Sequence, residues 1–261
     1  MSNLSDIGFP VESHEEFLEL INQAYERGKS IEAEMGQYIQ YEDASGAELW
    51  LQINQAEELI GMNPHFNGKS RRWVCITGPV NRPESELDGA FHGWAAPEFP
   101  NRPETGMYPF VFDVPNFYTM GEFDFPKSHL VQLTAFAQEI TLYDKESDFL
   151  DSQPEDFPMS AQSFIPSGLF DLGEQGPKEP QALGILSGVI KQHEKLTSTL
   201  KKGAFHWMLV ETLGGEVDVV TDASLCNKAP KEGGIVHGNF WLSGKIIGAP
   251  KYRKVVWTNW L

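Results

Sequence analysis

The chain has 261 residues and a formal net charge of −17, because 37 Asp and Glu residues outnumber 20 Lys and Arg residues. A hydrophobic content of 41%, with 12% aromatic residues, excludes a disordered chain and predicts a substantial core divided between two domains. No apolar run is long enough to span a bilayer, and the first residues lack the basic and apolar regions of a secretory signal. We therefore expect a soluble cytoplasmic protein with no membrane partner.

The charge is divided unequally along the chain. Residues 1–180 carry 10 Lys and Arg against 31 Asp and Glu, which gives −21, whereas residues 181–261 carry 10 against 6, which gives +4. An acidic surface repels polyphosphates, so nucleic acid is not expected as a partner. The opposite signs predict that C-terminal lysines face the acidic part or an acidic partner, with ordinary solvated lysines as the alternative. The lysines concerned are Lys191, Lys195, Lys201 and Lys202.

The N-terminal part predicts a helix followed by a hairpin. Ser13 and Glu16 have the spacing of a capping box, and apolar residues then recur at helical spacing, so Ser13–Arg27 should be an amphipathic helix. Gln37–Glu42 and Ala47–Ile53 alternate between apolar and polar residues across a four-residue turn that ends in glycine, which is typical of a hairpin.

Further strands are expected at Arg71–Gly78, Leu87–Ala95 and Phe110–Val114. A Phe-Pro segment occurs both near the start of the chain and at residues 125–129, and each copy precedes an apolar-periodic stretch, the second being Leu130–Ile140. A duplicated unit of helix and hairpin is one interpretation, and coincidence is the other.

The C-terminal part contains the clearest strand pattern. Phe205, Trp207 and Leu209 occupy one face of a strand, and we expect that face to be buried because it carries the larger apolar area. A glycine pair at residues 214–215 then predicts a tight turn into a returning strand. The other expected strands are Ala182–Lys191, Ile235–Ile247 and Lys254–Leu261.

Together these patterns predict an α+β fold. Residues 1–145 would form an acidic α+β domain with an antiparallel sheet. Residues 181–261 would form a small antiparallel β-barrel of the OB type, because their strands are bent at glycines, with a meander sheet as the alternative. Residues 146–180 would connect the two. Within this connection Ser163–Phe170 is too apolar for a free linker, so Phe164, Ile165 and Phe170 are expected to be buried.

Four segments within residues 161–245, AQSFIPSGLF, LGILSGVI, FHWMLVETLGGEVDVV and GGIVHGNFWLSG, resemble an uncharacterised family of bacterial hypothetical proteins. That family has no established activity, ligand or catalytic residues. The resemblance therefore implies a soluble cytoplasmic protein of bacterial type and implies no function.

Strong catalytic and metal-binding motifs are absent from the sequence. There is no phosphate loop, and none of the patterns GxGxxG, GxSxG, HExxH or CxxC is present. Cys75 and Cys226 are expected to be reduced and structural. No motif assigns a metal site, and the cofactor is left open.

A looser set of polar residues indicates a pocket in the N-terminal part. His65 lies between two amides in a stretch expected to be an irregular loop, and Asp88, His92 and Trp94 would share one face of a strand, near Glu48 on the hairpin. These five residues form a candidate site for a divalent cation or a small polar ligand. The alternative is a set of strand-end residues that are merely hydrogen-bonded.

These observations favour a non-enzymatic protein that binds another protein or a small molecule, since aromatic residues and acidic surface are abundant and catalytic motifs are missing. The alternative is a metal-dependent enzyme or a small-ligand module that uses the N-terminal pocket. The sequence does not decide between enzyme and non-enzyme, and it does not indicate an oligomeric state.

Overall fold

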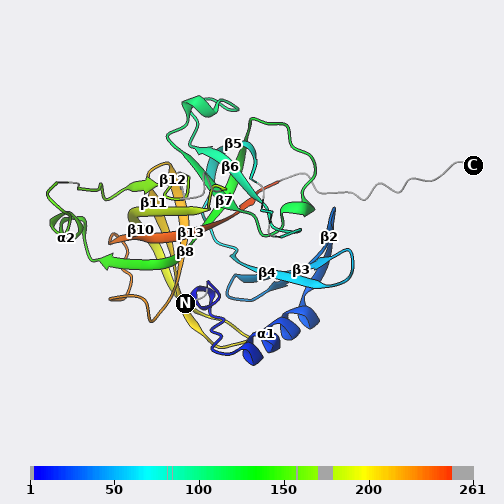
Figure 1. Ribbon diagram of the computed structural model, residues 1–261. Coiled ribbons are helices and arrows are strands. Elements are labelled where there is room, and N and C mark those ends of the chain that lie inside the picture. Colours follow the sequence, from blue (N-terminus) through cyan, green and yellow to red (C-terminus); the bar gives the residue numbers. More distant parts are fainter. Residues whose placement is uncertain (1–2, 81, 84, 157, 170–178, 249–261) are drawn as a thin grey trace, which may run out of the picture.

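The computed structural model describes residues 3–80, 82–83, 85–156, 158–169 and 179–248. In this part of the chain thirteen strands form two sheets (Figure 1). The helices are few and short, apart from α1 (His14–Arg27). The remaining helical segments are α2 (Glu146–Asp151) and the 3₁₀ turns η1 (Ser5–Ile7), η2 (Pro103–Thr105) and η3 (Phe117–Thr119).

The first sheet is antiparallel, with the order β1-β2-β3-β4. Its strands are β1 (Lys29–Ala33), β2 (Gly36–Glu42), β3 (Ala47–Asn54) and β4 (Leu59–Phe66). Helix α1 packs against this sheet (Figure 1), and its apolar face is buried there. The predicted helix and hairpin are confirmed. The predicted cap is present too, because Ser13 Oγ accepts a hydrogen bond from the Glu16 N–H at 3.2 Å.

The second sheet is mixed, with the order β11-β12-β8-β5-β6-β7-β13-β10-β9. Its strands are β5 (Arg72–Val80), β6 (Ala90–Ala95), β7 (Pro109–Asp113), β8 (Lys127–Tyr143), β9 (Ser163–Ile165), β10 (Leu183–Thr197), β11 (Ala204–Thr212), β12 (Gly215–Asp222) and β13 (Ile235–Ile246). Additional pairings of β10 with β11 and of β8 with β13 close a ring of five strands, β10-β11-β12-β8-β13. The pairings are antiparallel except for β12 with β8 and β13 with β7.

The predicted α+β fold with a small C-terminal barrel of the OB type is wrong. The structure is mostly β, and strands β5 to β8 share one mixed sheet with β10 to β13. The described strands of the C-terminal part, β10 to β13, therefore do not close a barrel by themselves, because β8 completes the ring. Where the domain boundaries fall stays a prediction.

The sequence pattern did not identify residues 130–140 as a strand, because most of this part of β8 is buried on both faces. Val131–Ala137 is buried without interruption, so the alternation of Gln132 and Thr134 with apolar residues does not mark a face exposed to water here. The stretch Leu130–Ile140 is therefore strand, and the suggested second copy of a helical unit is wrong.

Strand β11 separates the two main hydrophobic cores. Its face with Phe205, Trp207 and Leu209 is buried against α1 and the first sheet, which confirms the prediction. Met208 and Val210 on the opposite face are also buried, in the core enclosed by the second sheet.

The apolar segment before β10 is packed only in part as predicted. β9 pairs with β10, and the buried Phe164 ring stacks on Tyr108 with a centroid distance of 4.9 Å. Ile165 is 46% exposed, so its predicted burial is wrong, because neighbouring residues of a strand point in opposite directions. Phe170 and the predicted strand Lys254–Leu261 lie outside the described residues.

The predicted orientation of the lysines is confirmed at Lys201, whose Nζ lies 3.1 Å from Glu19 Oε2 on α1. Lys191 instead pairs at 3.1 Å with Glu211 of the adjacent strand. Lys195 and Lys202 are exposed, as solvated lysines would be. The cysteines are free, Cys75 buried and Cys226 half-buried, as expected.

Replacing Phe164 by Ala should lower the free energy of unfolding by about 3–5 kcal/mol, because a buried ring is removed and a cavity remains. Replacing its neighbour Ile165 by Ala should cost less than about 1 kcal/mol, since that side chain keeps much of its contact with water. Urea titrations of the two variants measure the difference. Equal costs would contradict this packing of β9.

Asp6, in η1, is a buried carboxyl group at the N-terminal end of the fold. Its Oδ1 accepts a hydrogen bond from the Asp222 N–H at 2.9 Å, and the residue is 3% exposed. Burial raises the pKa of Asp6 to about 7, and the Asp222 carboxylate adds to the rise, whereas the hydrogen bond from the Asp222 N–H opposes it. The folded protein therefore favours the protonated carboxyl group.

The contribution of Asp6 to stability should be complete below its ordinary pKa of 3.8 and should be lost as the pH rises to about 7. The free energy of unfolding should fall by roughly 4 kcal/mol over this pH range. Asp6→Asn keeps an acceptor without the charge, so it should be more stable than the parent at pH 7.5 and similar to it at pH 4. Chemical denaturation at both pH values provides the comparison. An advantage of the same size at both would show that Asp6 is already ionised in the fold.

Candidate functional site

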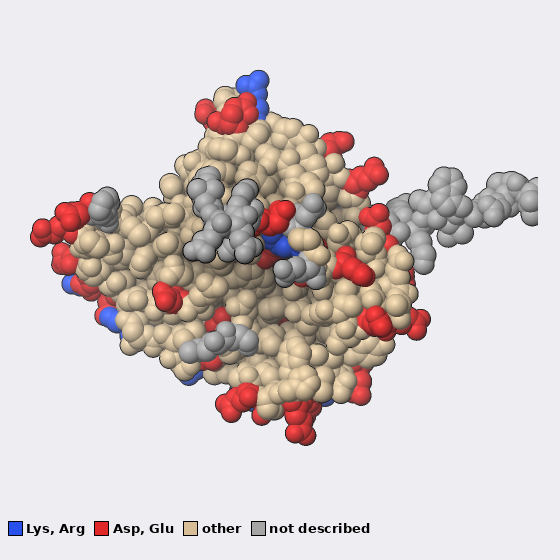
Figure 2. Space-filling model, in the orientation of Figure 1, with Lys and Arg blue, Asp and Glu red and all other residues tan. Residues whose placement is uncertain are grey.

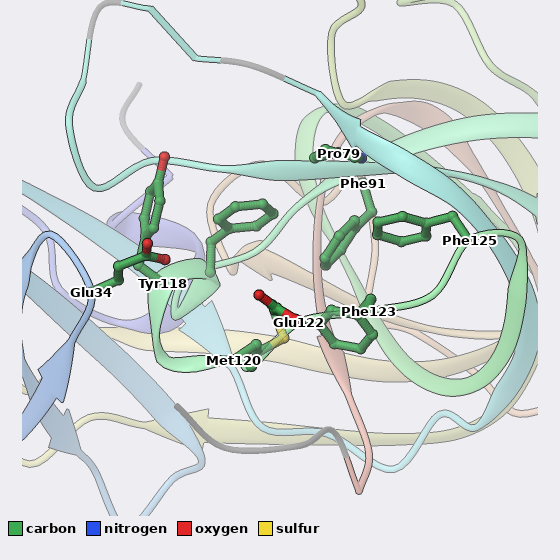
Figure 3. A pocket seen from close by; sticks show the side chains of 10 residues that line it. Glu34, Pro79, Phe91, Tyr118, Met120, Glu122, Phe123 and Phe125 are labelled. Atoms are coloured by element: carbon green, nitrogen blue, oxygen red, sulfur yellow. The ribbon is translucent and has the colours of Figure 1, made fainter. Parts of the chain in front are cut away.

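An apolar pocket of about 510 Å³ lies where the loop between β7 and β8 meets β6 (Figure 3). Half of its lining residues are aromatic, and the lining includes two carboxylates but neither lysine nor arginine. The lining residues are Glu34, Pro79, Phe91, Phe117, Tyr118, Met120, Gly121, Glu122, Phe123 and Phe125. We call this cavity the aromatic pocket.

Phe91 is the base of the aromatic pocket. It lies on β6, is 2% exposed, and packs on the core ring of Phe112 at 6.2 Å. Three rings of the loop surround it, with centroids at 5.0 Å for Phe117, 5.6 Å for Phe123 and 6.0 Å for Phe125. Because the loop rings rest on a residue of the core, the pocket is an extension of the core surface towards solvent.

The wall formed by η3 is held by the first sheet. The hydroxyl of Tyr38 on β2 donates to the Leu87 carbonyl at 2.7 Å and accepts from the Tyr118 N–H at 3.4 Å. The N–H of Glu34, just after β1, donates to the Tyr118 carbonyl at 3.2 Å. Phe117 also lies directly over Gly89, where a Cβ atom would overlap the ring. These contacts fix the position of the wall before any ligand binds.

Two carboxylates border the aromatic pocket. Figure 3 shows Glu34 beside Tyr118 on one side, and Glu122 reaching into the space between Met120 and Phe123. Both glutamates are exposed. The arrangement offers apolar ring surface together with negative charge.

Sequence reasoning missed the aromatic pocket. Phe117, Tyr118, Met120, Phe123 and Phe125 fall within nine residues that connect two strands. They follow neither strand nor helix periodicity, so no pattern assigned them to a core. Their density in a connecting loop was the available signal, because loops normally carry polar residues and ring-rich loops often line binding sites.

The predicted site residues lie elsewhere, at the interface between the two sheets. His65 is on β4, not in an irregular loop, and is paired across the sheet with Glu48 on β3. Both are buried and point towards the barrel strands. Lys245 Nζ on β13 lies 2.5 Å from Glu48 Oε2, and the Trp50 indole N–H donates to the same oxygen at 2.8 Å. The charge of Glu48 is thus compensated within the fold by that of Lys245.

His65 continues this interface, which we call the polar seam. Its Nδ1 lies 2.8 Å from Ser243 Oγ, and its Nε2 lies 2.9 Å from Gln132 Oε1. The Gln132 amide nitrogen donates to Asp218 at 2.8 Å, so its oxygen must accept from His65. The proton of His65 therefore lies on Nε2. The imidazole is neutral because burial, together with the Lys245 charge, holds the pKa of His65 well below the ordinary range. The seam here is closed to ligands because His65 is fully buried.

Asp88 lies at the other end of the polar seam, in a small polar cavity of about 70 Å³. One oxygen of Asp88 accepts from the Gln52 amide at 2.5 Å and from the Asn63 amide at 2.6 Å. Opposite it, Asp113 is held by Arg82 at 2.7 Å and by the Trp241 indole at 2.6 Å. Burial raises the pKa of Asp113, and Arg82 opposes that rise. The cavity has room for a few water molecules.

The last two predicted residues do not reach the polar seam. His92 is half-buried on β6, and its Nδ1 lies 2.7 Å from Thr77 Oγ1 on β5. Trp94 is paired with Cys75 and Pro109 on the neighbouring strands. Three of the predicted residues, Glu48, His65 and Asp88, therefore border one interface, whereas His92 and Trp94 lie apart from it. Among the described residues, no group of three or more His, Cys, Asp and Glu side chains is placed to hold a metal ion.

Comparison of the chain with protein-family models, with curated proteins and with solved structures finds no match. The resemblance of residues 161–245 to a bacterial family stays a prediction. In the described part of the chain, no helix is long and apolar enough to cross a membrane.

Neutral His65 should make stability fall at low pH. Its pKa is lowered in the fold, so protons bind preferentially to the unfolded chain once the pH drops below about 6.5, with a slope of up to about 1.4 kcal/mol per pH unit. His65→Gln keeps hydrogen-bonding capacity and cannot titrate. Its deficit relative to the parent should therefore shrink between pH 7.5 and pH 5 in urea titrations. A constant deficit would show that His65 titrates normally in the fold.

Proposed function

We propose that the protein is a non-enzymatic binding protein and that the aromatic pocket takes a small, largely apolar ligand. The observation that carries this proposal is the pocket itself. A volume of about 510 Å³ falls in the range of small-molecule sites, which are lined mainly by apolar and aromatic side chains with a few polar groups. We further propose that the protein acts in the cytoplasm of a bacterium.

The pre-formed wall supports binding of a ligand. Phe117 and Tyr118 are held by Gly89, Tyr38 and the strand end at Glu34, so little conformational freedom remains to be lost on binding. Phe125 is 38% exposed, so apolar area is still open to be covered by a ligand.

The alternative function, a metal-dependent enzyme or a small-ligand module, would have to use the small polar cavity at Asp88 and Asp113. That cavity has room for only a few waters, and its carboxylates are already engaged, Asp88 by the amides of Gln52 and Asn63 and Asp113 by Arg82. We therefore rank it second, although a paired set of carboxylates with an arginine is a recognisable setting for acid–base chemistry.

The neutral fluorescent probe N-phenyl-1-naphthylamine tests the proposal, because its emission rises in an apolar site. It should bind the parent protein with one site per chain. Phe125→Ala removes an exposed ring of the pocket and should weaken binding at least about tenfold, which corresponds to 1.4 kcal/mol. Phe99→Ala is the matched control, because Phe99 is 51% exposed and is not among the residues of the pocket.

Thermal unfolding of both variants establishes that each is folded at the temperature of the titration. Absence of any saturable binding to the folded parent protein would contradict the proposal. So would equal affinities of the parent and the Phe125→Ala variant, because the probe would then lie elsewhere.

A further inference from the structure

We propose that the ligand of the aromatic pocket is an organic cation, a quaternary ammonium ion or a protonated amine with apolar substituents. This inference rests on the proposed function of the pocket. It adds the charge of the ligand, which the volume and the apolar lining alone do not determine.

The charge of the lining is the first observation. Of the ten residues around the cavity, Glu34 and Glu122 are acidic and none is basic. Glu122 reaches into the space that a ligand would occupy (Figure 3). The protein as a whole carries −17, and Figure 2 shows far more acidic than basic side chains on the face in view. A positive ligand would be attracted both at long range and within the pocket, whereas an anion would be repelled.

The aromatic rings are the second observation. The face of an aromatic ring is negative and attracts a cation placed over it, most strongly where water is excluded. Elsewhere the chain uses its own cations in this way, for example Lys69, whose Nζ lies 4.6 Å from the centroid of the Trp207 ring. Among the described residues, no lysine or arginine occupies the rings of the aromatic pocket. Phe91 is covered, but the loop rings of Phe117, Tyr118, Phe123 and Phe125 are partly exposed and can be contacted by a cation from outside.

The nature of the lining selects among cations. Magnesium and calcium ions take six or more oxygen ligands, and zinc takes four nitrogen, sulfur or oxygen ligands. Two glutamates in an otherwise apolar and mostly aromatic or aliphatic lining supply too few of these ligands. An ammonium ion with apolar substituents is weakly hydrated, and its alkyl or aryl groups can contact the rings while the charge lies near Glu122. The volume of about 510 Å³ admits such a molecule as a whole.

A pair of isosteric probes tests the inference. Phenyltrimethylammonium and tert-butylbenzene have nearly the same shape and differ in charge. Each competes against N-phenyl-1-naphthylamine for the pocket of the full chain at low ionic strength. We expect the cation to displace the fluorescent probe at a concentration at least about tenfold lower than the neutral compound. Raising the salt concentration should reduce that preference, because the glutamates are exposed.

In the double variant Glu34→Gln/Glu122→Gln the preference should largely disappear, so that phenyltrimethylammonium and tert-butylbenzene displace the fluorescent probe at similar concentrations. The matched control is Glu15→Gln/Glu26→Gln on α1, which removes the same net charge from exposed positions outside the pocket and should keep the preference.

The outcomes separate the two proposals. Equal displacement by both compounds would overturn the organic-cation inference and leave the apolar binding function intact. Displacement by neither compound would also overturn the organic-cation inference, whereas the binding function is tested separately by the titration with N-phenyl-1-naphthylamine. A preference that the α1 control loses as fully as the pocket variant would also overturn the inference, because it would reflect net charge alone.

Discussion

The arrangement of the two sheets depends on one buried carboxylate, that of Asp218 on β12, which is inaccessible to water. Four groups donate to it, at distances of 2.8–2.9 Å: the Trp207 indole, the Gln132 amide, and the backbone N–H groups of Lys69 and Ser70. A buried charge without partners is costly, so each of these donors is held in place. The chain approaches closely enough only because residue 68 is glycine, since a Cβ atom there would overlap the carboxylate.

This constraint extends to the aromatic pocket through the first sheet. Gln132 carries the hydrogen-bond network on to His65 on β4, which fixes the first sheet against the barrel strands. The same sheet presents Tyr38, which holds η3. The loop wall is held by the first sheet, and the base at Phe91 belongs to the second sheet. Because the two sheets are fixed against each other, the wall and the base keep fixed positions relative to each other. A binding pocket made from a connecting loop can therefore be pre-formed.

Local features were predictable from the sequence, and long-range ones were not. The capped helix α1 and the β2-β3 hairpin follow from short-range chemistry, the Ser13 cap and a tight turn, and so they were predicted correctly. The fold class was not, because it depends on β8, whose residues pair with those of β12 and β13 at separations of 84 to 115 residues along the chain. Nothing in a single sequence states which strands lie beside a strand that is buried on both faces.

The candidate site also depends on long-range contacts that the sequence does not state. A polar residue that pairs inside the fold and one that binds a ligand look the same in a sequence. Glu48 and His65 stand out in the sequence as polar residues, and the structure gives each an internal partner, Lys245 for Glu48 and Gln132 for His65. The aromatic pocket is the converse, since its loop rings follow no sequence pattern of a core, and in the structure they remain partly uncovered. A site is recognised by groups left without a partner within the fold, and that property is created only when distant segments meet.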